Sequence, residues 1–220
     1  MDNILVIGSS GHAKAVIDAV EQQGAYKIAG LLDPFRELGQ QTLGYPILGD
    51  ERNLQSLVGT HEISGLLVAI GDNYARGTVV AQVRDLHPQV RFVSAIHPRA
   101  YVSNSSSVGP GTVIMAGVAV NPCCSIGPFC ILNTNSSIDH DSQMRSYSSL
   151  APGVTAGGGC TIGEYSAICI GSSVCHNIEI GAHSIVGAGS TVIRDVGPHR
   201  VAYGTPAVEI RERREGEGYL

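Results

Sequence analysis

The chain has 220 residues, of which 28 are Gly, 15% are charged and none is Trp, and its net charge is −5. A Gly-rich, weakly charged composition is typical of turn-dense β architectures and argues against an ordinary helical enzyme. Because the charge balance is acidic and no basic block is longer than the segment RERR near the end, a nucleic-acid partner is not expected.

The start of the chain predicts a soluble, cytoplasmic protein. Its first residues, MDNILVIG, carry an acid and only a short apolar run, unlike a secretory signal. No segment approaches the ~18 apolar residues that a membrane span needs, so no membrane insertion is expected. Six Cys, at positions 123, 124, 130, 160, 169 and 175, form no CxxC pair. We expect them to be free thiols that fill small spaces in the core.

The first hundred residues predict a small α/β domain. The segment NILVIGSSGHAKAVIDAVEQQG has the pattern of a strand, a Gly-containing turn and a helix, and YKIAGLLDP that of a second strand. Another strand, turn and helix follow in GLLVAIGDNYARGTVVAQV. We therefore expect a Rossmann-like domain over residues 1–95, with the boundary at AIHP.

The turn after the first strand has the residue types of an anion site. Backbone N–H groups at the first turn of a helix bind anions, and a carboxylate at the next strand end, here Asp33, accepts from a ribose or a base. Gly8 and Gly11 give only G-x-x-G, which is short of the dinucleotide fingerprint, and His12 follows directly. Two interpretations stay open, a phosphate or nucleotide site and a plain tight turn.

From Val102 to Val192 the sequence repeats every six residues. Of the sixteen positions in steps of six, fifteen are Val, Ile, Leu or Met, and the other is Ala156. Four residues after each of these aliphatic positions, the residue is usually small. One large and one small inward residue per hexad describe a short strand and a turn, and three such strands form a triangular coil. The repeat predicts a left-handed parallel β-helix of about five coils over residues 96–205.

The motif IDHDSQM places a histidine between two aspartates inside this repeat. Because the inward positions are Ile138 and Ser142, the His140 side chain should point out of the prism. One coil further on the same face lies Gly158, which should leave open space beside the imidazole. A surface histidine in a polar turn is the plain interpretation, and an imidazole paired with Asp141 on a rigid wall is the functional one.

Several motifs occur together in a specific order: IGSSGHAK, LLDP, AIGDN, AIHP, VIMAGVAVN, LNTNSSIDHD and YGTPA. Over residues 3 to about 207 the chain therefore resembles the hexapeptide-repeat sugar acetyltransferases of the sialic-acid O-acetyltransferase and bacillosamine N-acetyltransferase type. Within this family, the chain looks most similar to the enzymes that acetylate nucleotide-linked 4-amino-4,6-dideoxy sugars, such as GDP-perosamine N-acetyltransferases.

The resemblance implies an acetyl-CoA-dependent N-acetyltransferase of bacterial surface-glycan biosynthesis, such as that of lipopolysaccharide O-antigen. It implies a homotrimer with acetyl-CoA in the groove between neighbouring β-helices, the sugar nucleotide against residues 1–95, and no metal. Residues 206–220 form a charged tail that could close the last coil or contact the CoA phosphates through Arg211 or Arg213. An ordinary solvated ending is the plainer interpretation of the tail.

The resemblance also assigns residues. It implies His140 as the general base and Asp141 as its acidic partner, which would fix the tautomer and stabilise the imidazolium. It places these residues at the sugar nucleotide: Gly8, Gly11, His12, Asp33, Asp72, Asn73 and Asn133. It places these at acetyl-CoA: Ser149, Gly158 and Ile170. Many members have a second histidine nine residues after the base, where this chain has Ser149, which cannot carry charge.

Three alternatives stay open. His140 could equally deprotonate a sugar hydroxyl, which would make the enzyme an O-acetyltransferase. The DHD motif offers metal ligands, although zinc sites of this kind use three histidines and the stacked positions, Pro122 and Gly158, provide none. A non-catalytic trimeric scaffold would explain the repeat, but it would leave His140 and the α/β domain without a role. His176, two coils from His140 on the same face, is a further candidate residue.

Overall fold

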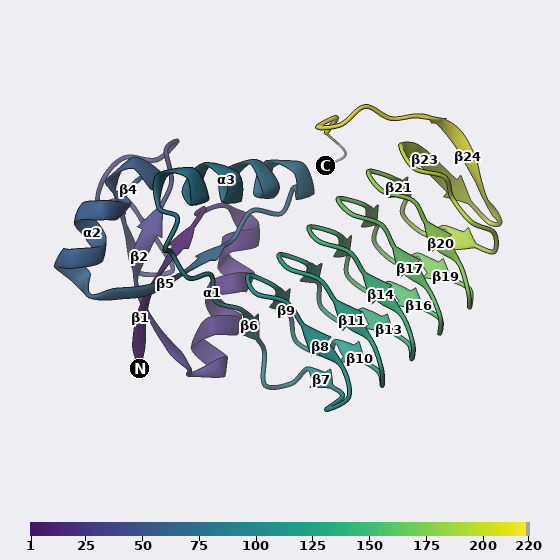
Figure 1. Cartoon of the computed structure of the whole chain (residues 1–220), viewed down its shortest axis with the longest axis horizontal. Helices are drawn as coiled ribbons and strands as arrows, with labels where there is room; N and C mark the ends of the chain where they lie inside the picture. Colours follow the sequence, from purple (N-terminus) through teal and green to yellow (C-terminus); the bar gives the residue numbers. More distant parts are fainter. Residues whose placement is uncertain (219–220) are drawn as a thin grey trace.

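The computed structural model describes residues 1–218 and places a small α/β domain beside the first coils of a long prism (Figure 1). The domain is Rossmann-like and has a five-stranded sheet of order β3-β4-β2-β1-β5, parallel except for β3 with β4. Its strands are β1 (Asp2–Ile7), β2 (Tyr26–Leu32), β3 (Gln41–Thr42), β4 (Tyr45–Gly49) and β5 (Ile63–Val68). Its helices are α1 (Gly11–Gln23), η1 (Glu51–Asn53), α2 (Leu54–His61) and α3 (Asn73–Leu86).

Both faces of this sheet are covered, which explains the continuous apolar run from Ile4 to Ile7 in β1. Helix α1 packs on one face, and its buried stripe belongs to a core that continues into the prism. Helices α2 and α3 cover the other face, in a second core that includes Phe129 of the prism. The strand–turn–helix segments expected from the sequence are thus confirmed.

The prism is a left-handed parallel β-helix with three faces, as the period of six predicts. Its eight-stranded face contains β6 (Ala95–Ile96), β9 (Val113–Ile114), β12 (Ile131–Leu132), β15 (Ser149–Leu150), β18 (Ala167–Ile168), β21 (Ile185–Val186), β23 (Arg200–Gly204) and β24 (Ala207–Glu212). Its six-stranded face contains β7 (Tyr101–Val102), β10 (Ala119–Val120), β13 (Ser137–Ile138), β16 (Thr155–Ala156), β19 (Ser173–Val174) and β22 (Thr191–Val192). Its five-stranded face contains β8 (Ser107–Val108), β11 (Ser125–Ile126), β14 (Gln143–Met144), β17 (Thr161–Ile162) and β20 (Glu179–Ile180).

The hexad positions determine what lies inside the prism. Each short strand pairs with the strand one coil further on, as Ile138 does with Ala156, and this register is kept from β7 to β22. The aliphatic positions from Ile114 to Val192 are at most 4% exposed, whereas Val102 and Val108 in the first coil are partly exposed. The repeat therefore fixes which side chains point into the prism and which point out of it.

The remaining expectations on the fold concern cysteines and the tail. Cys124, Cys130 and Cys160 are buried and fill small inward positions, but Cys123 and Cys175 are exposed at corners, so the core-filling role does not extend to them. Strand β24 pairs antiparallel with β23 and closes the last coil. Part of the tail, residues 219–220, lies outside the described residues. No helix in residues 1–218 has the length and apolar content of a membrane span.

Candidate active site

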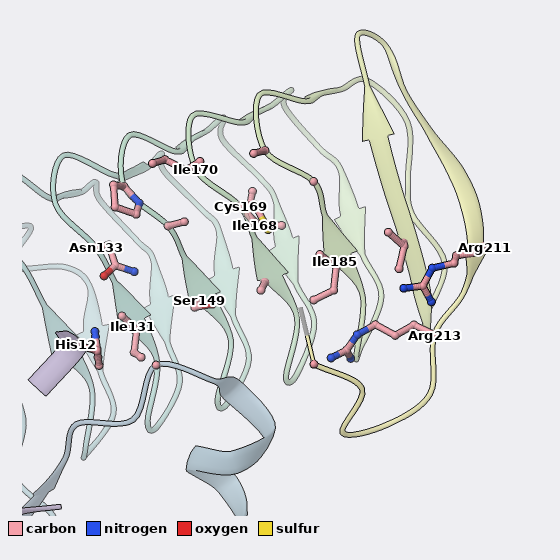
Figure 2. Close-up of a pocket in the computed structure, with 18 residues that line it drawn as sticks. His12, Ile131, Asn133, Ser149, Ile168, Cys169, Ile170, Ile185, Arg211 and Arg213 are labelled. Atoms are coloured by element: carbon pink, nitrogen blue, oxygen red, sulfur yellow. The ribbon is translucent and has the colours of Figure 1, made fainter. Parts of the chain in front are cut away.

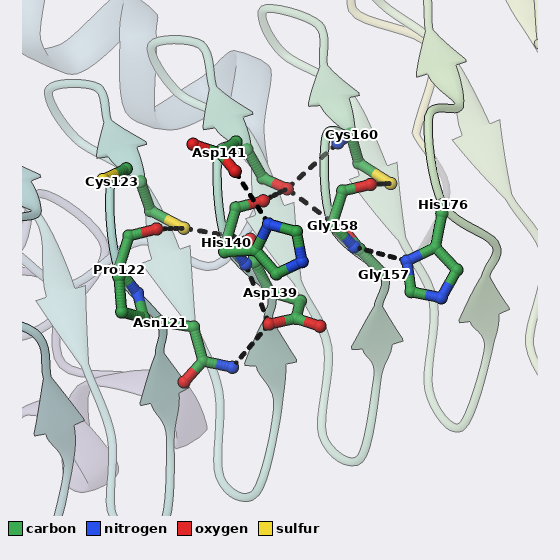
Figure 3. Close-up of polar contacts among 12 residues, drawn as sticks. Asn121, Pro122, Cys123, Asp139, His140, Asp141, Gly157, Gly158, Cys160 and His176 are labelled. Carbon is green, nitrogen blue, oxygen red and sulfur yellow. Dashed lines mark hydrogen bonds and ion pairs between the residues drawn. The ribbon is translucent and has the colours of Figure 1, made fainter.

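The HD pair lies on the corner between β13 and β14, at the outside of the prism (Figure 3). The Nδ1 atom of His140 is 2.7 Å from Oδ2 of Asp141, and the two side chains are 59% and 67% exposed. The outward direction expected for His140 is thus confirmed. The bond with Asp141, and then the charge of Asp139, raise the pKa of His140 above its usual value.

A second carboxylate holds the backbone of this corner. Oδ1 of Asp139 accepts from the backbone N–H of His140 at 2.8 Å and from the amide of Asn121 at 2.8 Å. Asp141 itself has a φ of 58°, a left-handed conformation that Asp tolerates better than most residues. With Nδ1–H donated to Asp141, the neutral imidazole keeps its Nε2 lone pair exposed, where it can accept a proton.

Gly158 is the next residue on this wall, one coil along. A Cβ on Gly158 would lie 2.7 Å from Cε1 and 2.8 Å from Nε2 of His140, so the imidazole itself lies against the glycine. The expected open space beside the ring is therefore wrong, because the ring fills it. The N–H of Gly158 donates to Nδ1 of His176 at 2.9 Å, so this peptide contacts both histidines.

A cavity of about 840 Å³, here called the N-terminal cavity, lies at the carboxyl ends of the parallel strands β1, β2 and β5. Four of the predicted nucleotide residues line it: Gly8, His12, Asp33 and Asp72. Open parallel sheets commonly bind their ligands at this edge.

Local contacts explain the residue types at several positions of this cavity. Gly8 has a φ of 104°, and a Cβ there would lie 2.9 Å from the carbonyl oxygen of Ala69, so only glycine fits. The Asp33 carboxylate accepts from the Ser9 hydroxyl and, at 2.9 Å, from the N–H of Phe35. The Phe35 side chain is 93% exposed at the cavity. The cavity thus offers a carboxylate and an aromatic ring beside the start of α1.

Three predicted nucleotide residues, Gly11, Asn73 and Asn133, do not line this cavity. Gly11 is exposed at the start of α1. Asn73 is 1% exposed, and its amide donates to the Ser149 hydroxyl and to the Ser166 carbonyl, both at 3.0 Å. Its place as a nucleotide ligand stays a prediction, and this burial argues against it, because the amide is committed to the β-helix.

A second cavity, here called the β-helix groove, has a volume of about 650 Å³ along the eight-stranded face (Figure 2). Asn133, Ser149 and Ile170 line it, and Arg211 and Arg213 of the tail lie at its far end. Gly158 does not line it. Most of its other lining residues are aliphatic, so the groove is an apolar channel with a few polar groups.

His12 connects the two cavities, since it lines both of them. Burial, together with the charge of Arg76, lowers the pKa of His12 to about 4, so the ring is neutral near pH 7. Its Nε2 atom is buried and has no hydrogen-bond partner among residues 1–218. A buried polar atom of this kind is an expected contact point for a ligand.

Arg76 was not singled out by sequence analysis. It is fully buried, and its guanidinium donates to the carbonyls of Phe129 and Tyr147 and to Oδ1 of Asn73, at 2.7 to 2.9 Å. These bonds fix α3 to a corner of the β-helix. A weak signal was present, because Arg76 occupies the same helix face as the buried Val80 and Val83.

The candidate residues thus form two groups. The corner with His140 lines neither cavity, whereas most of the predicted nucleotide residues and two of the three predicted coenzyme residues line one or both of them. Gly11, Asn73 and Gly158 line neither. Within residues 1–218, no group of three or more His, Cys, Asp or Glu side chains could hold a metal ion. In place of the second histidine of many relatives, Ser149 is 7% exposed and accepts from Asn73.

Comparison with known proteins starts from the N-terminal part, where residues 3–83 match the family model of the PglD N-terminal domain. PerB from Caulobacter crescentus, solved in complex with CoA and GDP-perosamine, shares 37% identity over 96% of this chain and 98% of PerB, with a TM-score of 0.88. The acetyltransferase domain of PglB from Neisseria gonorrhoeae, solved with acetyl coenzyme A, shares 30% identity over 94% and 98% of the two chains, with a TM-score of 0.87.

A curated relative is the UDP-N-acetylbacillosamine N-acetyltransferase of Bacillus subtilis. It is 34% identical over 120 residues, which are 53% of this chain and 52% of that protein, so the match spans about half the length of the relative. The two solved structures, by contrast, are similar to this chain almost from end to end.

Proposed function

The chain belongs to the family of sugar N-acetyltransferases that join a PglD-type N-terminal domain to a left-handed parallel β-helix, and we propose that it acetylates the 4-amino group of a nucleotide-linked 4-amino-4,6-dideoxy sugar with acetyl-CoA as donor. The resemblance inferred from the sequence motifs is thereby confirmed. Support for the substrate class comes from PerB, which was solved with CoA and GDP-perosamine.

The observation that carries the proposal is the exposed His140–Asp141 pair. As the sugar amine attacks the thioester carbonyl, its nitrogen gains positive charge and must lose a proton. His140 accepts this proton at Nε2, while Asp141 keeps Nδ1–H in place and stabilises the imidazolium. The C–S bond then breaks, and the CoA thiolate takes up a proton as it leaves. The Asp139 carboxylate, which accepts from the backbone N–H of His140, also stabilises the positive charge of the imidazolium.

The N-terminal cavity is the proposed site of the nucleotide. The first N–H groups of α1 favour a phosphate, and Asp33 beside Phe35 offers an acceptor and a stacking surface for ribose or base. His12 is placed where the cavity meets the β-helix groove, so its unpartnered Nε2 can bind the substrate between nucleotide and sugar. Asn133, on the wall of the groove, is the proposed partner of the sugar ring.

The separation of His140 from both cavities supports an oligomeric site. We propose a homotrimer in which the His140 corner of one copy faces the cavities of its neighbour, with acetyl-CoA in the groove between the two β-helices. Ser149, Gly158 and Ile170 are then expected to contact the coenzyme. The proposal also places the enzyme in the cytoplasm and in surface-glycan biosynthesis, such as that of O-antigen.

The direct test measures thiol release from acetyl-CoA with UDP-, dTDP- and GDP-linked 4-amino sugars, and with free sialic acid as the hydroxyl acceptor. We expect turnover of a nucleotide-linked 4-amino sugar, best with GDP because of the similarity to PerB, and its loss in His140→Ala. Turnover with sialic acid alone would make the enzyme an O-acetyltransferase. A folded wild type that turns over none of these acceptors would overturn the proposal in favour of a scaffold, and activity lost on chelation would indicate a metal site.

A further inference from the structure

His176 is an exposed histidine whose tautomer is fixed by the backbone. Its Nδ1 atom accepts the N–H of Gly158 at 2.9 Å (Figure 3). An imidazole nitrogen that accepts a hydrogen bond carries no proton, so the neutral ring carries its proton on Nε2. The corner therefore presents one N–H donor, of known identity, that no residue in the described part of the chain accepts.

The glycines of the previous coil show that this arrangement is built into the sequence. A Cβ on Gly157 would lie 2.9 Å from both the backbone nitrogen and Nδ1 of His176, and a Cβ on Gly158 would overlap His140. Two consecutive glycines thus accommodate two imidazoles, one on each side. His140 and His176 are therefore fixed to one wall, two coils apart, which corresponds to about 10 Å at the spacing of hydrogen-bonded strands.

The position along the prism indicates which substrate meets this donor. The α/β domain packs against the earlier coils as far as Ser149 and Ser166, to which Asn73 donates. The coils from β19 onwards, which carry His176, extend beyond these contacts (Figure 1). In the proposed trimer, a sugar nucleotide that reaches His140 from the corresponding domain of the neighbouring copy leaves the later coils for the second substrate. The His176 donor thus lies on the side from which the acyl donor must extend.

We propose that Nε2–H of His176 donates to an amide carbonyl of the pantetheine arm of acetyl-CoA and so positions the thioester beside His140. This inference rests on the proposed function. With bond lengths of about 1.3 to 1.8 Å, the two amide carbonyls of an extended arm lie about 7 and about 12 Å from the thioester carbon. The separation of about 10 Å between the two corners lies within this range. His176 is on this basis a residue that binds the coenzyme arm and takes no proton from the reaction.

Two substitutions separate this role from a structural one. In His176→Asn, Oδ1 replaces Nδ1 as acceptor of the Gly158 N–H, but the outward donor is lost. In His176→Gln, the terminal amide replaces the outward donor, but the acceptor beside Gly158 is lost. We expect His176→Asn to weaken CoA binding by about 3- to 10-fold in calorimetry, the effect of one hydrogen bond, and His176→Gln to bind within about twofold of wild type.

Kinetics and a truncated ligand sharpen the test. The KM for acetyl-CoA should rise in His176→Asn with kcat nearly unchanged, because the donor acts on binding and not on proton transfer. Adenosine 3′,5′-bisphosphate, which lacks the pantetheine arm, should bind wild type and variant alike. Equal CoA affinity in wild type and His176→Asn would overturn the inference, and so would a loss in His176→Gln as large as that in His176→Asn.

The outcomes distinguish this inference from the proposed function. If CoA binds and His176→Asn weakens it, but no sugar is acetylated, the contact stands and the proposed reaction fails. If acetyl transfer is normal in His176→Asn at low acetyl-CoA, the reaction stands and the contact fails. A wild type that binds no CoA would overturn both.

Discussion

The imidazole of His140 lies against Gly158, so closely that a Cβ on the glycine would come within 2.7 Å of the ring. The glycine has no left-handed φ, and therefore the constraint on it is the ring and not the backbone. Position 158 thus determines where the proposed base can point, although residue 158 itself carries no functional group.

Gly158→Ala should therefore impair the reaction more than the fold. The added methyl group displaces a half-exposed ring that can rotate towards solvent, so the melting temperature should change by less than about 4 °C. The displaced Nε2 loses its position relative to the amine, and we expect kcat to fall by about 10- to 100-fold with a smaller change in KM. Steady-state kinetics beside a thermal melt check this. A normal kcat in a folded variant would show that the ring does not need this position.

Asp141→Asn tests the charge partner through the pH profile. Asp141 is the largest cause of the raised pKa of His140, so the variant should have a lower His140 pKa. Because the base must be neutral, the acid limb of kcat/KM should shift to lower pH in the variant, while the plateau falls by roughly one order of magnitude. Asn tolerates the φ of 58°, so the corner should keep its shape. An unshifted limb with an unchanged plateau would make Asp141 a turn residue only.

His140→Ala provides the matched reference for that profile. Removal of a general base should lower kcat by about 10²- to 10⁴-fold and abolish the acid limb, while CoA affinity remains. The kcat of Asp141→Asn should lie between those of wild type and His140→Ala. Near-normal turnover in His140→Ala would contradict the proposed base.

The features predicted from the sequence share one physical basis. A hexad with Ile138 and Ser142 inward leaves His140 no direction except outward, so the repeat predicted both the fold and the exposure of the histidine. The open space expected beside Gly158 was wrong, because the repeat positions Cα atoms but does not determine how a long side chain folds back over the next coil.

The features that could not be predicted depend on contacts between distant segments. Asn73 and Ser149 are 76 residues apart in the chain, and Arg76 contacts a carbonyl 53 residues away. Local periodicity places Arg76 on a buried helix face, but it does not show that main-chain carbonyls of a β-helix corner satisfy its charge. The motif AIGDN placed both Asp72 and Asn73 at the nucleotide by resemblance; the sequence could not show that the Asn73 amide also bonds to the prism.

His12 predicts a dependence of stability on pH. Its pKa is about 4 in the folded protein, against a usual value near 6.5, because burial and then Arg76 disfavour the charged ring. The unfolded chain thus binds a proton that the folded protein does not. The stability that the neutral His12 contributes is fully present above pH 6.5. It is lost as the pH falls from about 6.5 to about 4, which lowers the free energy of unfolding by an amount of order 1 to 3 kcal/mol.

Urea unfolding at several pH values, compared between wild type and His12→Gln, measures this contribution. The free energy of unfolding of wild type should fall more steeply between pH 6.5 and pH 4 than that of His12→Gln, since the variant lacks the ring whose pKa is lowered by folding. The carboxylates titrate in both proteins and cancel in the difference. Parallel curves would contradict a depressed pKa at His12.

Asn73 and Asp33 should respond in opposite ways to substitution, although the sequence placed both at the nucleotide. Asn73→Ala removes the donor to Ser149 and Ser166 and one acceptor of the buried Arg76, so the free energy of unfolding should fall by about 1 to 3 kcal/mol. The KM of this variant for the sugar nucleotide should stay within about twofold of wild type, because no atom of Asn73 lines the N-terminal cavity.

Asp33→Asn keeps an oxygen for the Phe35 N–H but loses the charge, so it should raise the KM for the sugar nucleotide with little effect on the free energy of unfolding. Denaturant titration and steady-state kinetics on the two variants test both expectations. A raised KM with normal stability in Asn73→Ala would show that Asn73 contacts the sugar nucleotide.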